Sequence, residues 1–223
     1  MQFQLTNEFL EQVEQLIANK DGSALRELLH EFHFADIAEI LEELNSDEAT
    51  YLIKLLASDI TSEALIELDE DIREKILDRL SPKEIAAELE EMDTDDAVDV
   101  MGELDEDVQK QVIGEIEDSE HVADIVELLK YDEDTAGALM AKELVRVKET
   151  WTVAGCVREM RRQAKNVTRV HSIYVINKEG KLTGRLSLKD LLTAGDKAHI
   201  SDVFIPKVDY VTVHTENEEV ARI

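Results

Sequence analysis

The sequence predicts a mainly α-helical chain in which a right-angled superhelix of short helices, an α-solenoid, precedes an α+β domain. Three observations support this prediction. An apolar residue returns every twelve positions, the charge balance changes sign near residue 140, and the hydrophobic pattern changes there from helical to mixed. The repeat comes first in the chain and sets the fold class.

The repeat is visible at two levels. The segments 37–49 and 85–97 agree at 7 of 13 positions. A period of twelve matches neither the seven-residue nor the eleven-residue repeat of a coiled coil, so a single long coiled coil is disfavoured. The repeated apolar positions are Phe32, Leu44, Leu56, Leu68, Leu80, Met92, Leu104 and Ile116.

Helix-starting residues lie between the apolar positions. Side chains that can cap a new helix recur there, and Pro82 follows one of them at the first helical position. Helices of roughly eight to ten residues are too short to be stable alone, so neighbouring units must bury one another's apolar faces. The expected N-cap residues are Ser46, Ser58, Ser81 and Thr94.

Charge divides the chain into two parts. Residues 1–140 hold 41 acidic and 9 basic side chains, a balance of −32, whereas residues 141–223 hold 11 acidic and 15 basic side chains, a balance of +4. The acidic part would repel nucleic acid phosphates, so we expect no nucleic acid partner. We expect an acidic superhelical domain over 1–130, a junction over 131–140, an α+β domain over 141–200, and the incomplete start of a second copy over 201–223.

The α+β domain is predicted from a change in pattern. Strands are expected over 144–147, 171–176 and 182–187, with a helix between the first two and another over 188–193. Further strands over 201–205 and 210–213 would open the second copy. The single cysteine, Cys156, lies on the apolar face of the first of these helices and is expected in the core. One cysteine and no long apolar run are typical of a soluble, cytosolic chain.

Four aspartates, Asp93, Asp95, Asp96 and Asp99, form the densest acidic cluster. Asp95 and Asp96 precede Asp99 by four and three residues, so a helix places their carboxylates on the face of Asp99, where the like charges repel. Carboxylate oxygens without nitrogen or sulfur ligands favour Mg²⁺ or Ca²⁺, and a site that retains waters suits Mg²⁺. The alternative is a group of solvated acids at a helix start. Standard catalytic motifs are absent, so we expect no enzyme.

A second motif lies at 184–191, with the sequence GRLSLKDL. Asp190 falls in the first turn of the expected helix, where it stabilises the helix dipole. The same carboxylate could accept hydrogen bonds from a ribose. Both interpretations remain open at this point.

Three segments together resemble one known family. The acidic repeat with MDTDDAVD at 92–99, the junction YDEDTAGALM at 131–140, and GRLSLKDL at 184–191 closely resemble the cytosolic N-terminal portion of the MgtE family of magnesium channels. The resemblance covers essentially the whole chain. It implies a superhelical N domain, a first CBS domain over 141–200 and the start of a second one from residue 201.

The resemblance also implies ligands and partners. In the family, Mg²⁺ binds between the N domain, the CBS domains and a connecting helix, and it holds the assembly compact and the pore shut. By motif, the metal ligands here would be Asp95 and Asp99, with Asp96 as a weaker neighbour. ATP would bind at the CBS domain, with candidate residues Ser172, Lys189 and Asp190. The implied partners are a transmembrane pore, a second CBS domain and a second copy of the chain.

The sequence thus predicts the Mg²⁺-sensing regulatory region of a magnesium transporter, on the cytoplasmic side of the membrane. Two alternatives remain open. A protein-interaction solenoid, similar to flagellar motor-switch domains, would bind a partner without responding to Mg²⁺. A CBS module that senses adenine nucleotides would leave the solenoid passive.

Overall fold

The computed structural model describes residues 4–164, 167, 170 and 172–223, and within it the chain forms two compact units. The first unit comprises Met1–Met92 and Asp96–Leu129, and the second comprises Asp93–Asp95 and Lys130–Ile223. The first unit is helical, and the second carries the only sheet of the described residues. The predicted fold class, an α-solenoid followed by an α+β domain, is therefore confirmed.

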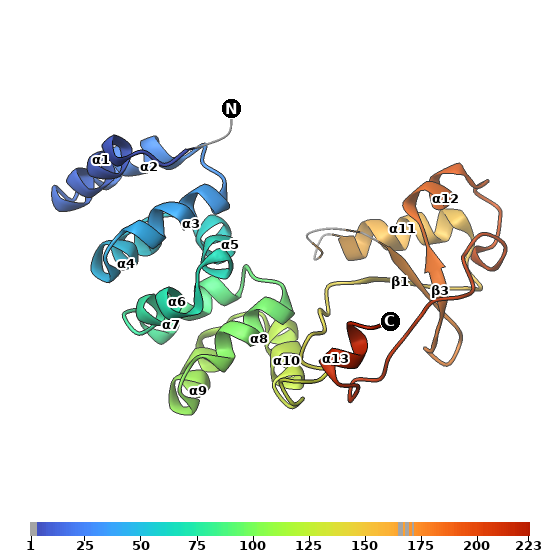
Figure 1. The fold of residues 1–223 in the computed structure, drawn as a ribbon. Coiled ribbons are helices and arrows are strands. Elements are labelled where there is room, and N and C mark those ends of the chain that lie inside the picture. Colours follow the sequence, from blue (N-terminus) through green and yellow to red (C-terminus); the bar gives the residue numbers. More distant parts are fainter. Residues whose placement is uncertain (1–3, 165–166, 168–169, 171) are drawn as a thin grey trace. The chain divides into compact units, whose positions relative to one another are not determined.

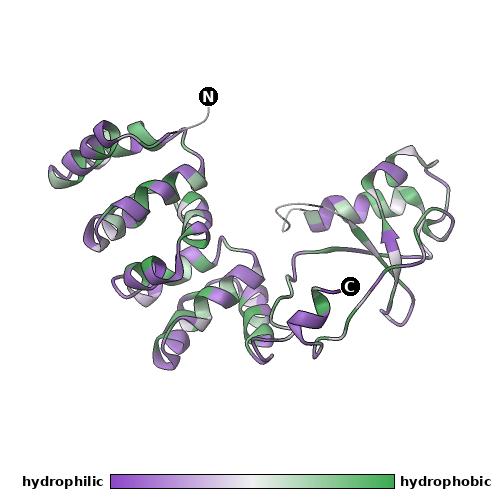
Figure 2. Cartoon of the chain, in the orientation of Figure 1, coloured by the Kyte–Doolittle hydropathy of each residue, from purple (hydrophilic) through white to green (hydrophobic). Residues whose placement is uncertain are grey.

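The helices of the solenoid follow one another in chain order (Figure 1). From α3 to α9, each helix begins twelve residues after the previous one. Hydrophilic and hydrophobic stretches alternate along each helix (Figure 2), as expected for helices that bury one face. The helices are α1 (Asn7–Ala18), α2 (Gly22–Leu29), α3 (Phe34–Glu43), α4 (Ser46–Leu55), α5 (Ser58–Glu67), α6 (Glu70–Leu77), α7 (Pro82–Leu89), α8 (Thr94–Gly102), α9 (Glu106–Glu115) and α10 (Ser119–Leu128).

The repeated apolar residues lie where helices end. Leu44, Leu68 and Ile116 are C-cap residues with extended backbones, and all three are buried. An extended residue cannot continue the helix, so the chain turns there. Its buried side chain holds the turn in the core. The twelve-residue period thus comprises one short helix and one buried corner.

Three of the four expected N-caps are displaced by one residue. Ser46, Ser58 and Thr94 are the first residues of their helices, so none of them is the N-cap residue. Asn45 caps α4 instead, because its Oδ1 accepts from the amides of Asp47 and Glu48 at 3.1 Å. The cap at Ser81 is confirmed: it forms a capping box with the third helical residue of α7.

The fourth residue of the repeated helices points into the solenoid. This position is apolar and buried in α3, α4, α7 and α8, but it is Arg73 in α6 and Gln109 in α9. Gln109 donates from Nε2 to the carbonyls of Met101 and Leu104, both at 2.9 Å. Arg73 donates from Nη1 to the carbonyls at the end of α5, namely those of Leu65, Ile66 and Leu68. Both side chains therefore donate to carbonyls at a helix end, where few backbone amides are left to do so.

The second unit is built on a three-stranded sheet of order β1-β2-β3. Strand β1 runs parallel to β2, and β2 runs antiparallel to β3. One face of the sheet is apolar, and Cys156 is fully buried in the core. Burial raises the pKa of this thiol to about 11, as expected for a core cysteine. The elements are β1 (Val145–Lys148), α11 (Val153–Gln163), β2 (Ile173–Ile176), β3 (Leu182–Leu186), α12 (Leu188–Thr193), η2 (Ile200–Asp202) and α13 (Asn217–Val220).

The strands expected at 201–205 and 210–213 do not form, so that prediction is wrong. Residues 200–202 form a 3₁₀ turn, and Ile205 makes one isolated bridge with Arg185. Residues 213–217 instead pair with the junction: Ala136 donates to the carbonyl of Thr215 at 2.8 Å, and Gly137 to that of Val213 at 2.9 Å. Expected strand residue 171 lies outside the described residues.

Gly184 is needed because two backbone segments approach closely. A Cβ at this position would collide with the carbonyl oxygen of Ile205 and with the ring of Phe204. We therefore expect Gly184→Ala to lower the free energy of unfolding of the second unit by roughly 1–3 kcal/mol. The control is Gly195→Ala, where nothing lies within 4 Å of the new Cβ. Urea unfolding followed by Trp151 fluorescence measures both, and equal stabilities would contradict the close approach.

Candidate functional site

The acidic cluster predicted from the sequence lies on α8. Asp95 and Asp96 are the second and third residues of this helix, and Asp99 lies on the following turn. Asp95 and Asp96 are half-buried and Asp99 is exposed. Residues four apart on a helix are neighbours, so the helix places Asp95 and Asp99 on one face. The predicted helical spacing is therefore present.

The described residues do not complete a metal site. Within the part of the chain that the structure describes, no group of three or more His, Cys, Asp or Glu side chains has the geometry to hold a metal ion. Asp95 and Asp99 together offer two carboxylates, which matches the few protein ligands that Mg²⁺ takes when it keeps several waters. The chemistry of these residues thus fits Mg²⁺, with the remaining ligands supplied by water or by other groups.

The first turn of α8 is capped from outside the helix. Thr94 is fully buried, and it donates from its amide and its hydroxyl to Oε2 of Glu143, at 3.1 and 2.9 Å. The amide of Lys142 donates in turn to Oγ1 of Thr94 at 2.9 Å. Residues 93–95 belong to the second unit, so all of these bonds lie within that unit. The Glu143 carboxylate therefore stabilises the helix end that precedes Asp95.

A buried cation also lies in the field of the aspartates. The hydrogen bonds that Arg73 donates to Glu103 raise the pKa of its guanidinium, and the negative charge of Asp99 adds to this effect. Arg73 and Glu103 form an ion pair, and their side chains are 14% and 11% exposed. The sequence analysis missed Arg73, although its position in the twelve-residue register is buried and apolar in α3, α4, α7 and α8.

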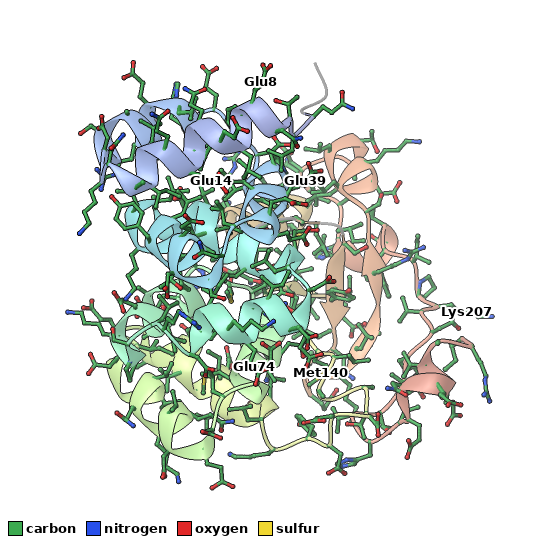
Figure 3. The ribbon with its side chains drawn as sticks, turned by 60° about the vertical axis from the view of Figure 1, so that its left-hand side comes forward. Glu8, Glu14, Glu39, Glu74, Met140 and Lys207 are labelled. Atoms are coloured by element: carbon green, nitrogen blue, oxygen red, sulfur yellow. The ribbon has the colours of Figure 1, made fainter. Side chains whose placement is uncertain are left out.

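Acidic side chains are frequent along the whole solenoid. Carboxylates project from its helices, with Glu8, Glu14, Glu39 and Glu74 labelled in Figure 3. In α3, burial raises the pKa of Glu42, and the charges of Asp69, Glu39 and Glu43 raise it further. Like charges therefore already oppose ionisation within the first unit.

The nucleotide candidates are separated in the second unit. Ser172 lines a cavity of about 230 Å³ together with Leu144, Val145 and Tyr174, whereas Lys189 and Asp190 lie on α12 and are absent from its described lining. Oδ2 of Asp190 accepts from the hydroxyl of Ser187 at 2.7 Å, and the amide of Asp190 donates to Oγ of Ser187 at 3.0 Å. Asp190 thus stabilises the helix start, as the structural interpretation predicts.

Tyr174 is a lining residue that the sequence analysis missed. It is 39% exposed and lies two residues after Ser172. Alternate residues of a strand share a face, so this spacing could have indicated an aromatic ring on the same side as Ser172. The cavity therefore combines apolar side chains, the hydroxyl of Ser172, the ring of Tyr174 and the carboxylate of Glu143.

The chain thus combines a helical solenoid that has an acidic surface with a small α+β unit. Two family models match the chain in succession: the MgtE intracellular N domain over residues 32–134 and the CBS domain over residues 136–197. None of the described helices is both long and apolar enough to cross a lipid bilayer.

Curated relatives carry one name. The chain is 34% identical to the magnesium transporter MgtE of Thermus thermophilus, across 95% of the chain and 47% of that protein. It is 28% identical to the magnesium transporter MgtE of Bacillus subtilis, across 93% of the chain and 46% of that protein. The chain thus spans about half the length of these relatives.

Solved structures agree in fold. The crystal structure of the cytosolic domain of the Mg²⁺ channel MgtE in complex with ATP is similar with a TM-score of 0.86 and 32% identity, covering 96% of this chain and 87% of that one. The soluble part of a magnesium transporter is similar with a TM-score of 0.81 and 28% identity, covering 96% and 84%. The chain belongs to the MgtE family, and its relatives are transporters and channels, not enzymes.

Proposed function

We propose that this chain is the Mg²⁺-sensing regulatory region of a magnesium transporter, on the cytoplasmic side of the membrane. One observation carries the proposal: two carboxylates one helical turn apart, Asp95 and Asp99, lie on a solenoid helix of a chain that is 34% identical to a magnesium transporter. Mg²⁺ bound there, with Asp96 as a neighbouring charge, would neutralise acidic surface. That neutralisation would favour a compact state in which the pore is closed.

The charge distribution supports this mechanism. The first 140 residues carry a balance of −32 and the remainder +4. Monovalent salt screens such charges over about 8 Å at physiological ionic strength, but it does not coordinate carboxylates. A ligand shifts a conformational equilibrium only if it binds one state more tightly. Mg²⁺ would meet this condition if the compact state brings further oxygen ligands to Asp95 and Asp99.

Calorimetric titration with MgCl₂ tests the binding step. The proposal expects a saturable heat with the wild-type chain, and no comparable heat with KCl at matched ionic strength. A flat MgCl₂ titration would contradict it. The protein-interaction alternative expects the flat result.

We further propose the domain organisation implied by the family: an N domain over 1–130, a junction over 131–140, a first CBS domain over 141–200 and the start of a second from 201. The bonds between residues 134–137 and 213–217 support a junction that belongs with the CBS part. The remaining partners would be the second CBS domain, a transmembrane pore domain and a second copy of the chain.

An adenine nucleotide is a second candidate ligand. The cavity beside Ser172 and Tyr174, and the similarity to a structure in complex with ATP, support it. Stacking on an aromatic ring contributes about 1–3 kcal/mol per base. We therefore expect Tyr174→Ala to weaken ATP binding about tenfold or more, and Tyr210→Ala, at another exposed tyrosine, to leave it unchanged. Equal ATP affinities of the wild type and Tyr174→Ala in calorimetry would exclude this pocket.

A further inference from the structure

One buried carboxyl group of the solenoid has no role in the proposed metal or nucleotide sites. Glu88, in α7, is only 6% exposed. Its Oε2 accepts a hydrogen bond of 2.6 Å from the hydroxyl of Thr61 in α5, a neighbour of α7. Burying an ionised carboxylate is costly unless a cation pairs with it, so such a group tends to be neutral.

The solenoid provides an internal comparison. Glu103 is also largely buried, but the guanidinium of Arg73 binds both of its oxygens. Glu88 faces hydroxyl groups instead, because Thr61 and Ser58 of α5 are the groups that hydrogen-bond to its carboxyl. The two glutamates therefore have different surroundings. Glu103 forms an ion pair with a cation, whereas Glu88 contacts hydroxyl groups, which can either donate or accept a hydrogen bond.

The position of Thr61 suits a carboxyl group in either protonation state. Its Oγ1 lies 2.6 Å from Oε2 of Glu88 and 3.3 Å from the carbonyl oxygen of Ala57, yet a hydroxyl has a single proton. If Glu88 is ionised, Thr61 donates to it. If Glu88 is protonated, the carboxyl donates to Thr61, and Thr61 donates to Ala57. Every group in this chain of bonds remains satisfied after a proton is taken up.

We propose that Glu88 is a proton-binding site between α5 and α7, and that proton release from it weakens the solenoid as the pH rises through neutrality. The ligand is the proton itself. The inference does not depend on Mg²⁺ or nucleotide binding. It concerns the first unit alone, to which Glu88, Thr61 and Ser58 belong.

The electrostatics agree with the geometry. Burial raises the pKa of Glu88 to about 7, the hydrogen bonds of Thr61 and Ser58 oppose the rise, and the charge of Glu91 adds to it. A carboxyl with a pKa raised in the folded state stabilises the fold fully below its unfolded value of 4.5. That stability is lost as the pH rises from there through about 7.

Other titratable groups surround this contact. His121 of α10 is distant from Glu88 in the sequence. Its ring nitrogen Nε2 nevertheless lies 2.9 Å from the carbonyl oxygen of Leu89, the residue next to Glu88. Glu84, on α7 itself, pairs with Lys54. The remaining charged side chains of α5, α7 and α9, the elements of this contact, are Asp59, Glu63, Glu67, Lys83, Glu106, Asp107, Lys110 and Glu115.

The test is Glu88→Gln, whose amide mimics the protonated carboxyl while every neighbouring charge and His121 are kept. Urea unfolding, followed by circular dichroism at several pH values, gives the equilibrium constant. We expect equal stabilities of the variant and the wild type at about pH 4.5, which is the pKa of this carboxyl in the unfolded chain. At about pH 8 the unfolding constant of the wild type should exceed that of the variant by about 300-fold. The control, Glu74→Gln on the exposed surface of α6, should follow the wild type.

A second measurement tests proton binding by Glu88 even if the Glu88→Gln variant does not fold. Carbon-13 NMR of the glutamate carboxyls in the wild-type chain follows the titration of Glu88 itself. A midpoint near neutrality supports the proposal, and a midpoint below about 5 overturns it. Parallel pH profiles of Glu88→Gln and the wild type would also overturn it.

Discussion

Replacing Arg73 with alanine is expected to lower the free energy of unfolding of the solenoid by about 3–5 kcal/mol. The substitution removes two kinds of partner at once. Glu103 would remain largely buried without its cation, since Arg73 Nε lies 2.9 and 3.1 Å from its two oxygens. The carbonyls of Leu65, Ile66 and Leu68 would also lose the hydrogen bonds that Nη1 of Arg73 donates to them. An unpaired buried charge costs far more than a lost surface contact.

Arg79→Ala is the matched control. Arg79 pairs with Asp47 at 3.1 Å, but their side chains are 43% and 89% exposed. An exposed pair contributes about 0–1 kcal/mol. Urea unfolding followed by circular dichroism compares the two variants. Replacing both Arg73 and Glu103 with methionine should recover part of the loss, because no buried charge then remains unpaired. Equal effects of Arg73→Ala and Arg79→Ala would show that burial does not strengthen the Arg73 pair.

The double variant Asp95→Asn/Asp99→Asn is expected to weaken Mg²⁺ binding on the order of tenfold or more, because affinity depends on the number of charged oxygen ligands. Stability without metal should change little. The variant removes a like-charge repulsion of a few tenths of a kcal/mol, and it also removes acids that favour the start of a helix by a similar amount. Calorimetry and thermal unfolding in EDTA measure the two quantities.

The control for this variant removes the same number of negative charges at the same spacing of four residues. Glu63→Gln/Glu67→Gln, on α5, neutralises two carboxylates four residues apart on another solenoid helix. If general negative charge attracted Mg²⁺, both double variants would lose affinity equally. The proposed site expects a loss only at Asp95 and Asp99.

Much of the solenoid follows from the twelve-residue repeat. Helix starts, buried corners and the core register are all set by where apolar residues recur. The same register could have revealed the two buried charged groups. Glu88 aligns with the fully buried Ile40 when the two similar segments are superposed, and Arg73 occupies the register position of Ile37 and Ile85. A charged residue at an apolar repeat position is therefore a specific signal of a buried polar contact.

Other features depend on contacts between residues far apart in the sequence. The cap at Asn45 rather than Ser46 depends on local geometry that either residue could have supplied. The carboxylate that caps α8 comes from Glu143, 49 positions away from Thr94. Strands were predicted from apolar residues at 201–213, but a strand needs a partner along its length, and Ile205 has a single bridge. The metal ligands Asp95, Asp96 and Asp99 and the nucleotide residues Ser172, Lys189 and Asp190 stay predictions.

Small-angle X-ray scattering in MgCl₂ and in KCl of equal ionic strength tests the central claim, that Mg²⁺ coordination by the acidic solenoid changes the conformation of this region. The account predicts that the radius of gyration falls on addition of millimolar MgCl₂, that KCl does not reproduce the change, and that Asp95→Asn/Asp99→Asn abolishes it. An identical radius of gyration in metal-free buffer and in saturating MgCl₂ would contradict the account.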